Sequence, residues 1–288
     1  MLLATVQPAT APAPAIAPGA PREVSALILR WSARGLMAMV WLSTLLFGVY
    51  IFFFYGGALA VGKAEQWNLV LPRLYDPESP AGTAGIGLHF VTGAIILALG
   101  FAQFIAPIRD RFPTVHRWLG RIYVVCCLAA AVGGLVFIFT VGTIGGTVMD
   151  IGFGLYGVLM AIAAVQTMRH ARAGRLEVHR QWAIRLFALA IGSWLYRMDY
   201  GFWLILANRL GHGENFTGPF DRVMAFAFYL PNLVVAEAYI RSQGKKAPAA
   251  LRLAASAVML GAAFLLLVGT YYFCKFYWIP GIALRFAG

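Results

Sequence analysis

Seven long apolar runs divide the chain, and each is long enough to cross a lipid bilayer as a helix. A transmembrane helix needs about 20 mostly apolar residues to span ~30 Å of hydrocarbon. Only 12% of the residues are charged, whereas a soluble domain carries about 25%. The sequence therefore predicts an all-α fold, a polytopic membrane helical bundle with about seven transmembrane helices. The predicted spans cover roughly 36–61, 84–107, 120–144, 150–168, 182–206, 222–241 and 252–278.

The N-terminal segment differs in character from the rest. Residues 1–30 are rich in alanine and proline, and they lack the basic residues and unbroken apolar stretch of a secretory signal. They are predicted to form a disordered cytoplasmic tail. A single transmembrane domain is predicted to follow over residues 31–288.

Lysine and arginine are distributed unevenly over the loops. With the N-terminus in the cytoplasm, 16 of the 23 fall ahead of the first apolar run and in the stretches 108–121, 169–185 and 241–252. The positive-inside rule therefore predicts a cytoplasmic N-terminus and a periplasmic C-terminus. The alanine-, arginine- and glycine-rich usage suggests a bacterial inner membrane. The net charge of +12 comes from arginine and lysine in the loops between the apolar runs, so it reports topology and we expect no binding to nucleic acid. The expected partners are the lipid bilayer and a membrane protein.

A Val-His-Arg triplet occurs twice, at residues 115–117 and 178–180. The same shift of 63 residues aligns Gln103 with Gln166 and Arg109 with Arg172. Each unit is a helix, a basic loop and a returning helix, so the second to fifth runs are predicted to form a four-helix bundle. A duplicated hairpin explains these matches, and convergent composition of membrane helices explains them as well.

His116 and His179 are predicted to lie in the first turns of the third and fifth helices, at one level of the bundle. Two imidazoles on facing helices are the axial ligands of a bis-histidine haem. The alternative is that both His-Arg pairs anchor lipid phosphates at the cytoplasmic surface. Polar side chains expected at the same level are Gln103 and Gln166. The arginines expected to bind haem propionates by charge-assisted hydrogen bonds are Arg117, Arg121, Arg180 and Arg185.

His89 is predicted to lie within the second helix, about a turn and a half from its outer end. An intramembrane histidine is a functional candidate. It is either a haem ligand in a different pairing or a group packed against a neighbouring helix. The 63-residue shift aligns it with Gly152, so the repeat supplies no second ligand at this level.

The stretch LYRMDYGFW places Arg197 and Asp199 inside the fifth helix. A charge there is costly unless it is paired or faces water, and residues two apart on a helix point in different directions. We therefore expect each to have a partner on another helix, with Asp221 and His89 as the candidates. The surrounding aromatic residues form either an interfacial belt or the wall of a quinone cavity; they are Trp194, Tyr196, Tyr200 and Trp203.

The sixth helix carries Pro231, Asn232 and Glu237. Proline interrupts the backbone hydrogen bonds, and the Asn232 side chain is expected to satisfy the freed groups. Glu237 is predicted to lie ~24 Å along the helix from Asp221, near the inner face. There it pairs with Arg185 or takes part in a proton relay.

Motifs of several enzyme classes are missing from the sequence, which has no GxxxxGK[ST], HExxH or GxSxG. The three cysteines, Cys126, Cys127 and Cys274, fall in apolar runs without metal-ligand spacing and are predicted to be core residues. The glycines of GTAGIGLHFVTG are spaced for close helix packing.

Four segments carry a resemblance to a family of predicted bacterial membrane proteins of unknown function. They are LHFVTGAIILALGFAQF, VHRWLGRIYV, VHRQWAIRLFAL and YLPNLVVAEAYI, and the similarity covers roughly residues 84–241. The resemblance implies a polytopic membrane fold and carries no activity with it.

A more distant likeness is to the transmembrane diheme cytochromes b that ascorbate reduces. It implies haem b and electron transfer. The chain departs from the pattern because its fourth helix carries no histidine at the required level, so a second haem lacks a ligand. The residues that match in order are His89, Gly93, Gln103, Arg109, His116, Gly120 and Arg121.

The leading functional hypothesis is a membrane redox component that binds one haem b or a quinone. The alternative is a non-enzymatic protein, either an accessory or structural membrane subunit or a small-solute transporter. Paired ligands on facing helices favour the first, whereas helices broken at mid-membrane are more typical of a transporter.

Overall fold

The structure is a computed structural model that describes residues 20–244 and 247–284, and this part is helical without strands. Six of its helices are long and apolar enough to cross a membrane. Large apolar side chains such as Phe139 and Leu206 face outward, as expected where lipid surrounds a helix. The all-α membrane fold is confirmed. The helices of at least 9 residues are α1 (Ala20–Ile51), α3 (Pro80–Leu99), α5 (Pro113–Thr140), α6 (Gly146–Arg172), α7 (Leu176–Ala190), α8 (Gly192–Leu206), α9 (Pro219–Ala227), α10 (Leu230–Ser242) and α11 (Ala249–Phe273). The short segments are η1 (Phe52–Gly56), α2 (Gly57–Ala60), η2 (Ala64–Leu69), η3 (Gly100–Phe104), α4 (Ala106–Arg111), η4 (Glu214–Phe216), η5 (Cys274–Trp278) and α12 (Ile279–Ala283).

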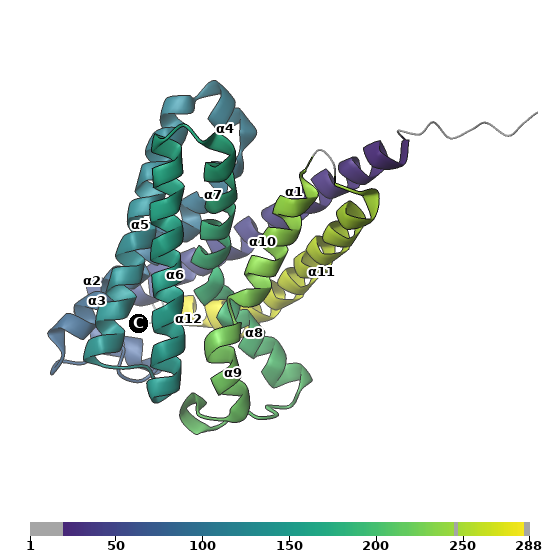
Figure 1. The fold of residues 1–288 in the computed structure, drawn as a ribbon. Coiled ribbons are helices and arrows are strands. Elements are labelled where there is room, and N and C mark those ends of the chain that lie inside the picture. The colour runs from purple at the N-terminus through teal and green to yellow at the C-terminus, as the bar shows by residue number, and fades with distance from the viewer. Residues whose placement is uncertain (1–19, 245–246, 285–288) are drawn as a thin grey trace, which may run out of the picture.

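Helices α3, α5, α6 and α7 form a four-helix bundle, which stands upright in Figure 1. In this bundle α3 packs on α5, α5 on α6, and α6 on α7, while α7 closes on α3. Helices α5 and α7 therefore lie diagonally across the bundle, as do α3 and α6. The bundle predicted from the second to fifth runs is confirmed. Helices α1, α10 and α11 form a second group that leans away from it, with α1 packed along α11.

Two glycines bring α3 and α5 into close contact. A Cβ added to Gly85 would lie 2.8 Å from the carbonyl oxygen of Gly133, and a Cβ added to Gly133 would lie 2.5 Å from that of Gly85. Both distances are shorter than a carbon–oxygen contact allows, so only glycine permits this backbone approach. The close packing predicted for the glycine-rich segment is confirmed, and it places His89 of α3 against α5.

The fifth predicted run is divided between two helices. Helix α7 ends at Ala190 and α8 begins at Gly192, so neither half is long enough to be one of the six long helices. At the break, the carbonyl oxygen of Leu189 accepts a hydrogen bond from the Tyr156 hydroxyl of α6. A Cβ on Gly192 would lie 3.1 Å from the Tyr156 ring. The Tyr156 side chain therefore packs at the break between α7 and α8. Hydropathy does not detect this break, because the residues on both sides of it are apolar.

The sixth predicted run is also interrupted, between α9 and α10. Pro231 lies in the first turn of α10, where a missing N–H breaks no helical hydrogen bond. The predicted role of Asn232 is wrong, because its amide nitrogen is buried without a hydrogen-bond partner. Phe228 and Tyr229 at the interruption pack against Tyr156. Tyr156 thus contacts both interruptions.

Helix α1 begins earlier than the first apolar run. Residues 1–19 of the predicted tail lie outside the described residues, whereas residues 20–30 are helical. Leu29 is buried against Ala255 and Met259 of α11. This contact between distant parts of the chain extends the helix beyond the stretch that composition alone identifies.

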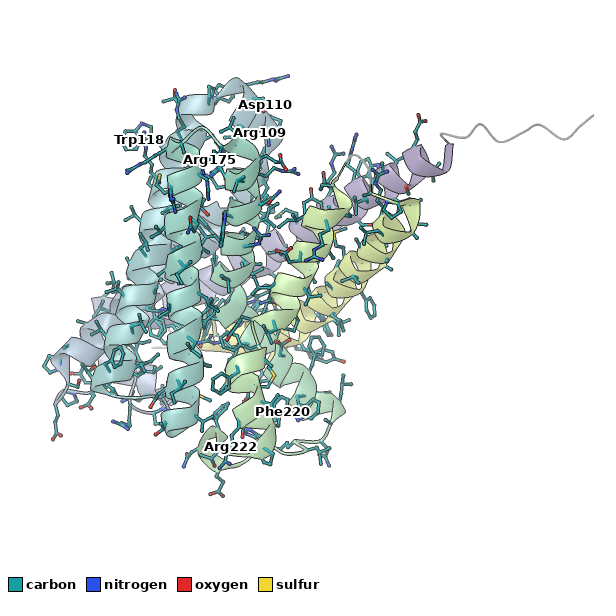
Figure 2. All side chains as sticks on the ribbon, in the orientation of Figure 1. Arg109, Asp110, Trp118, Arg175, Phe220 and Arg222 are labelled. Carbon is teal, nitrogen blue, oxygen red and sulfur yellow. The ribbon has the colours of Figure 1, made fainter. Side chains whose placement is uncertain are left out.

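Basic side chains gather at one end of the bundle. Arg109, Trp118 and Arg175 lie there in Figure 2, whereas Phe220 and Arg222 lie at the other end. We call the first the basic end; it includes the connections from α4 to α5 and from α6 to α7. The side of the membrane that it faces stays a prediction.

Candidate functional site

The predicted histidine pair lies at the basic end of the four-helix bundle. His116 is the fourth residue of α5, and His179 is the fourth residue of α7. Because these two helices are diagonal in the bundle, the imidazoles stand at one level on opposite sides of it.

His179 is held in one orientation by the backbone of α6. Its Nδ1 lies 2.9 Å from the carbonyl oxygen of Thr167. A carbonyl oxygen accepts only, so Nδ1 carries the proton and Nε2 of the neutral ring keeps its lone pair. Metal-bound histidines adopt this arrangement, with the second nitrogen hydrogen-bonded to a carbonyl or carboxylate.

Three further nitrogens at this end are buried without a hydrogen-bond partner: Nδ1 of His116, Nδ1 of His170 and Nε2 of Gln103. Gln103 lies against α5, because a Cβ on Gly120 would be 3.2 Å from its Oε1. Gly120 follows His116 by one helical turn. Buried polar groups are nearly always hydrogen-bonded. The layer formed by Gln103, His116, His170 and His179, here called the histidine layer, therefore has unused bonding capacity.

His170 was not predicted from the sequence. It lies three residues after Thr167 in the last turn of α6, so the two residues share a face of the helix. The repeat pointed to residues in the connecting loops and at the starts of helices, whereas His170 has no counterpart in the first unit. It follows the fourth apolar run (150–168) by two residues, and this position close to Gln166 at the basic end is the sequence signal that identifies it.

Glu237 forms the predicted ion pair with Arg185. Its Oε1 lies 2.6 Å from Nε of Arg185, and Arg241 approaches the other oxygen at 3.6 Å. The ion pair joins α10 to α7 and holds Arg185 beside the bundle. A structural link is thus present, and the proton relay stays a prediction.

The remaining arginines predicted to bind propionates lie at the surface of the basic end. Arg117 and Arg121 are exposed, and Arg121 lies 5.0 Å from the ring centre of Trp118. Arg180 is half-buried and lies next to His179 in sequence. Gln166 is half-buried in α6. Their positions suit phosphate groups of lipids as well as propionates.

His89 lies far from the histidine layer. Its Nδ1 is 3.0 Å from the carbonyl oxygen of Ala130 in α5. Ala130 is ~21 Å along α5 from His116. The alternative in which His89 shares an iron with a residue of the layer is therefore wrong.

His89 instead lines a cavity in the interior, whose volume is about 40 Å³. Arg197 of α8 lines the same cavity, so the two predicted neighbours are near each other. The predicted ion pairs are absent, because in the described part of the chain neither Arg197 nor Asp199 is paired with a charged side chain. Arg197 donates to the carbonyl oxygen of Ser193 over 2.7 Å.

Asp221, the other predicted partner, stabilises the opposite end. Its carboxylate accepts hydrogen bonds of 2.8 Å from the Tyr200 hydroxyl and from Nδ1 of His212. It also accepts from the backbone N–H groups of Gly213 and Gly218. These bonds tie the loop between α8 and α9 to α8. Sequence reasoning missed His212, because only the folded loop brings it to the carboxylate.

The aromatic residues of α8 do not enclose a quinone-sized space. Trp194 and Tyr200 are buried in the core, and Trp203 stacks on Phe220 with ring centres 4.3 Å apart. The cavity of about 40 Å³ beside Arg197 is far below the ~300–1,000 Å³ typical of small-molecule pockets. The geometry therefore gives the quinone hypothesis no site in α8.

The histidine layer has two imidazoles suited to a metal, and among the described residues no group of three His, Cys, Asp or Glu is arranged to bind a metal ion. The helical fold and its long apolar helices define an all-α polytopic membrane protein. The chain belongs to the family described as Predicted membrane protein (DUF2306), whose model matches residues 86–240. No curated protein and no solved structure matches the chain. The likeness to diheme cytochromes b is not shown by these comparisons and stays a hypothesis.

Proposed function

We propose that the protein is a membrane electron-transfer component that binds one haem b in the histidine layer, with His116 and His179 as axial ligands. The observation that carries this proposal is the layer itself. It combines two imidazoles at one level on diagonal helices with buried nitrogens that have no partner. Haem b, when bound, supplies a one-electron couple at the basic end.

The surroundings of the two histidines support axial ligation. The hydrogen bond to Thr167 orients the His179 ring and leaves Nε2 unprotonated. The Nδ1 of His116 is committed to no other group. Gly120, one turn further along α5, allows the Gln103 side chain to pack directly against this helix, 3.2 Å from where a Cβ would lie, and so places the buried Gln103 amide beside the layer.

The charges of the basic end support the same function. Arg117 and Arg180 follow the two ligands directly in sequence, so their guanidinium groups suit the carboxylates of haem propionates. The ion pair between Arg185 and Glu237 holds α10 beside α7, the helix that carries His179.

An absorption spectrum of the purified protein in detergent tests the proposal. We expect the reduced-minus-oxidised difference spectrum to contain cytochrome b bands, and we expect His116→Ala and His179→Ala to abolish them. His89→Ala is the matched control, and its loss should leave the bands unchanged. The side chain of His89 contacts Ala130, which lies ~21 Å along α5 from His116. A folded wild-type protein without colour, after expression with ample haem, would overturn the proposal. Bands that persist in both variants of the layer would do the same.

A further inference from the structure

The interior cavity contains a cation without a counter-ion. Helices α1, α3, α5, α6, α7 and α8 contribute to its lining, together with η1, and Arg197 is the charged residue among them. No aspartate or glutamate lines the cavity. Arg197 makes no ion pair elsewhere in the described residues.

The depth of Arg197 makes this arrangement costly. It lies ~14 Å from the end of α8, and His89 lies ~14 Å from the start of α3. Both groups are therefore inside the hydrocarbon layer, where an uncompensated charge is strongly disfavoured. A guanidinium has five N–H donors. The Ser193 carbonyl oxygen takes one, and the Phe47 ring lies 5.5 Å from the guanidinium carbon.

We infer that this cavity binds a small monovalent anion, held by the guanidinium of Arg197. A volume of about 40 Å³ holds roughly three water-sized groups. That admits a halide ion, or a carboxylate as small as formate, together with water. The Nδ1 of His89 donates to Ala130, so its Nε2 accepts a hydrogen bond from that water.

The helix break contributes to the same site. Ala190 and Ser193, on either side of the interruption between α7 and α8, both line the cavity. Helix α8 begins at Gly192, and the N-terminal end of a helix carries a partial positive charge. Membrane proteins place interrupted helices where the backbone lines an internal cavity, and they use such helix ends to bind ions.

This site is separate from the histidine layer, so its occupancy does not depend on haem. The test is the melting temperature of the full-length protein in detergent, in gluconate buffer titrated with chloride and, separately, with formate. We expect the melting temperature to rise saturably, because a ligand that binds only the native state stabilises it. Arg197→Gln should abolish the rise. Arg222→Gln, which removes an exposed arginine at the opposite end, should preserve it.

A second pair of variants tests the cavity without changing the charge. Gly93 lines the cavity, and a Cβ added there meets no atom within 4 Å. Gly93→Leu fills the space and should weaken anion binding at least about tenfold, equivalent to about 1.4 kcal/mol. Gly93→Ala should retain binding. The inference is overturned if the wild type shows no saturable response to either anion, or if Gly93→Leu responds as the wild type does. The leucine variant decides the matter even where Arg197→Gln does not fold.

Discussion

At the scale of single residues, Tyr156 shows how one side chain satisfies a broken helix. Its hydroxyl donates to the Leu189 carbonyl at the end of α7. Its ring fits against Gly192 and stacks on Tyr229, with ring centres 5.7 Å apart. The Leu189 carbonyl also accepts a backbone N–H at the end of α7, so the hydroxyl is a second donor to a carbonyl that has no water to bond with inside a membrane.

Tyr156→Phe removes this donor and leaves the ring in place. We expect a loss of about 0.5–1.5 kcal/mol in the free energy of unfolding, because the Leu189 carbonyl loses its side-chain donor but keeps its backbone N–H. Chemical unfolding in detergent, followed by circular dichroism, measures the loss. Tyr277→Phe is the matched control, because Tyr277 is 63% exposed. Equal stability of the two variants would show that the hydroxyl of Tyr156 contributes nothing.

At the scale of elements, glycine sets the distance between α3 and α5. The carbonyl oxygens of Gly85 and Gly133 face the partner helix so closely that neither residue can carry a side chain. This contact also allows His89 to reach the Ala130 carbonyl. The packing of two helices thus determines where an intramembrane histidine points.

Gly133→Ala should destabilise the protein by about 1–3 kcal/mol through overpacking. Gly261→Ala in α11 is the control, because a Cβ there meets no atom within 4 Å. The control should be neutral or stabilising by about 0.5–1 kcal/mol, since alanine is the better helix former. Thermal unfolding of both variants in detergent makes the comparison. A Gly133→Ala protein as stable as the control would contradict the close packing.

At the scale of the whole molecule, the charge is polarised along the bundle. The connections from α4 to α5 and from α6 to α7 carry arginine at one end, whereas η4 and the start of α9, at the other end with Phe220, carry Glu214 and Asp221. Such polarity orients a membrane protein during insertion, with the basic loops retained in the cytoplasm. The histidine layer would then lie on the cytoplasmic side.

Cysteine labelling tests this orientation. In a chain whose three native cysteines are replaced, a thiol reagent that cannot cross the inner membrane should label Glu214→Cys in intact spheroplasts. It should label Glu177→Cys only after permeabilisation. Both positions are exposed, so accessibility of the side chain does not limit either reaction. The reverse pattern would place the basic end and the histidine layer outside the cytoplasm.

Local sequence determined the features that depend on local chemistry. Apolar runs located the helices, because a segment that crosses lipid must satisfy its backbone hydrogen bonds within itself and therefore forms a helix. The spacing of Gly85 indicated close packing, and the repeated triplet placed His116 and His179 at one level of the bundle. The depth of Glu237 along its helix predicted its ion pair with Arg185.

Tertiary structure decided what depends on contacts between distant segments. The fifth run breaks where Tyr156 of another helix supplies a hydroxyl, and no residue within the run itself records that contact. Asp221 bonds to His212 rather than to Arg197, because the loop between them folds back over the carboxylate. Arg197 is thereby left beside His89 in a cavity without a carboxylate. Hydrophobicity and charge are properties of each residue, whereas the partner of a buried polar group is chosen only when helices pack.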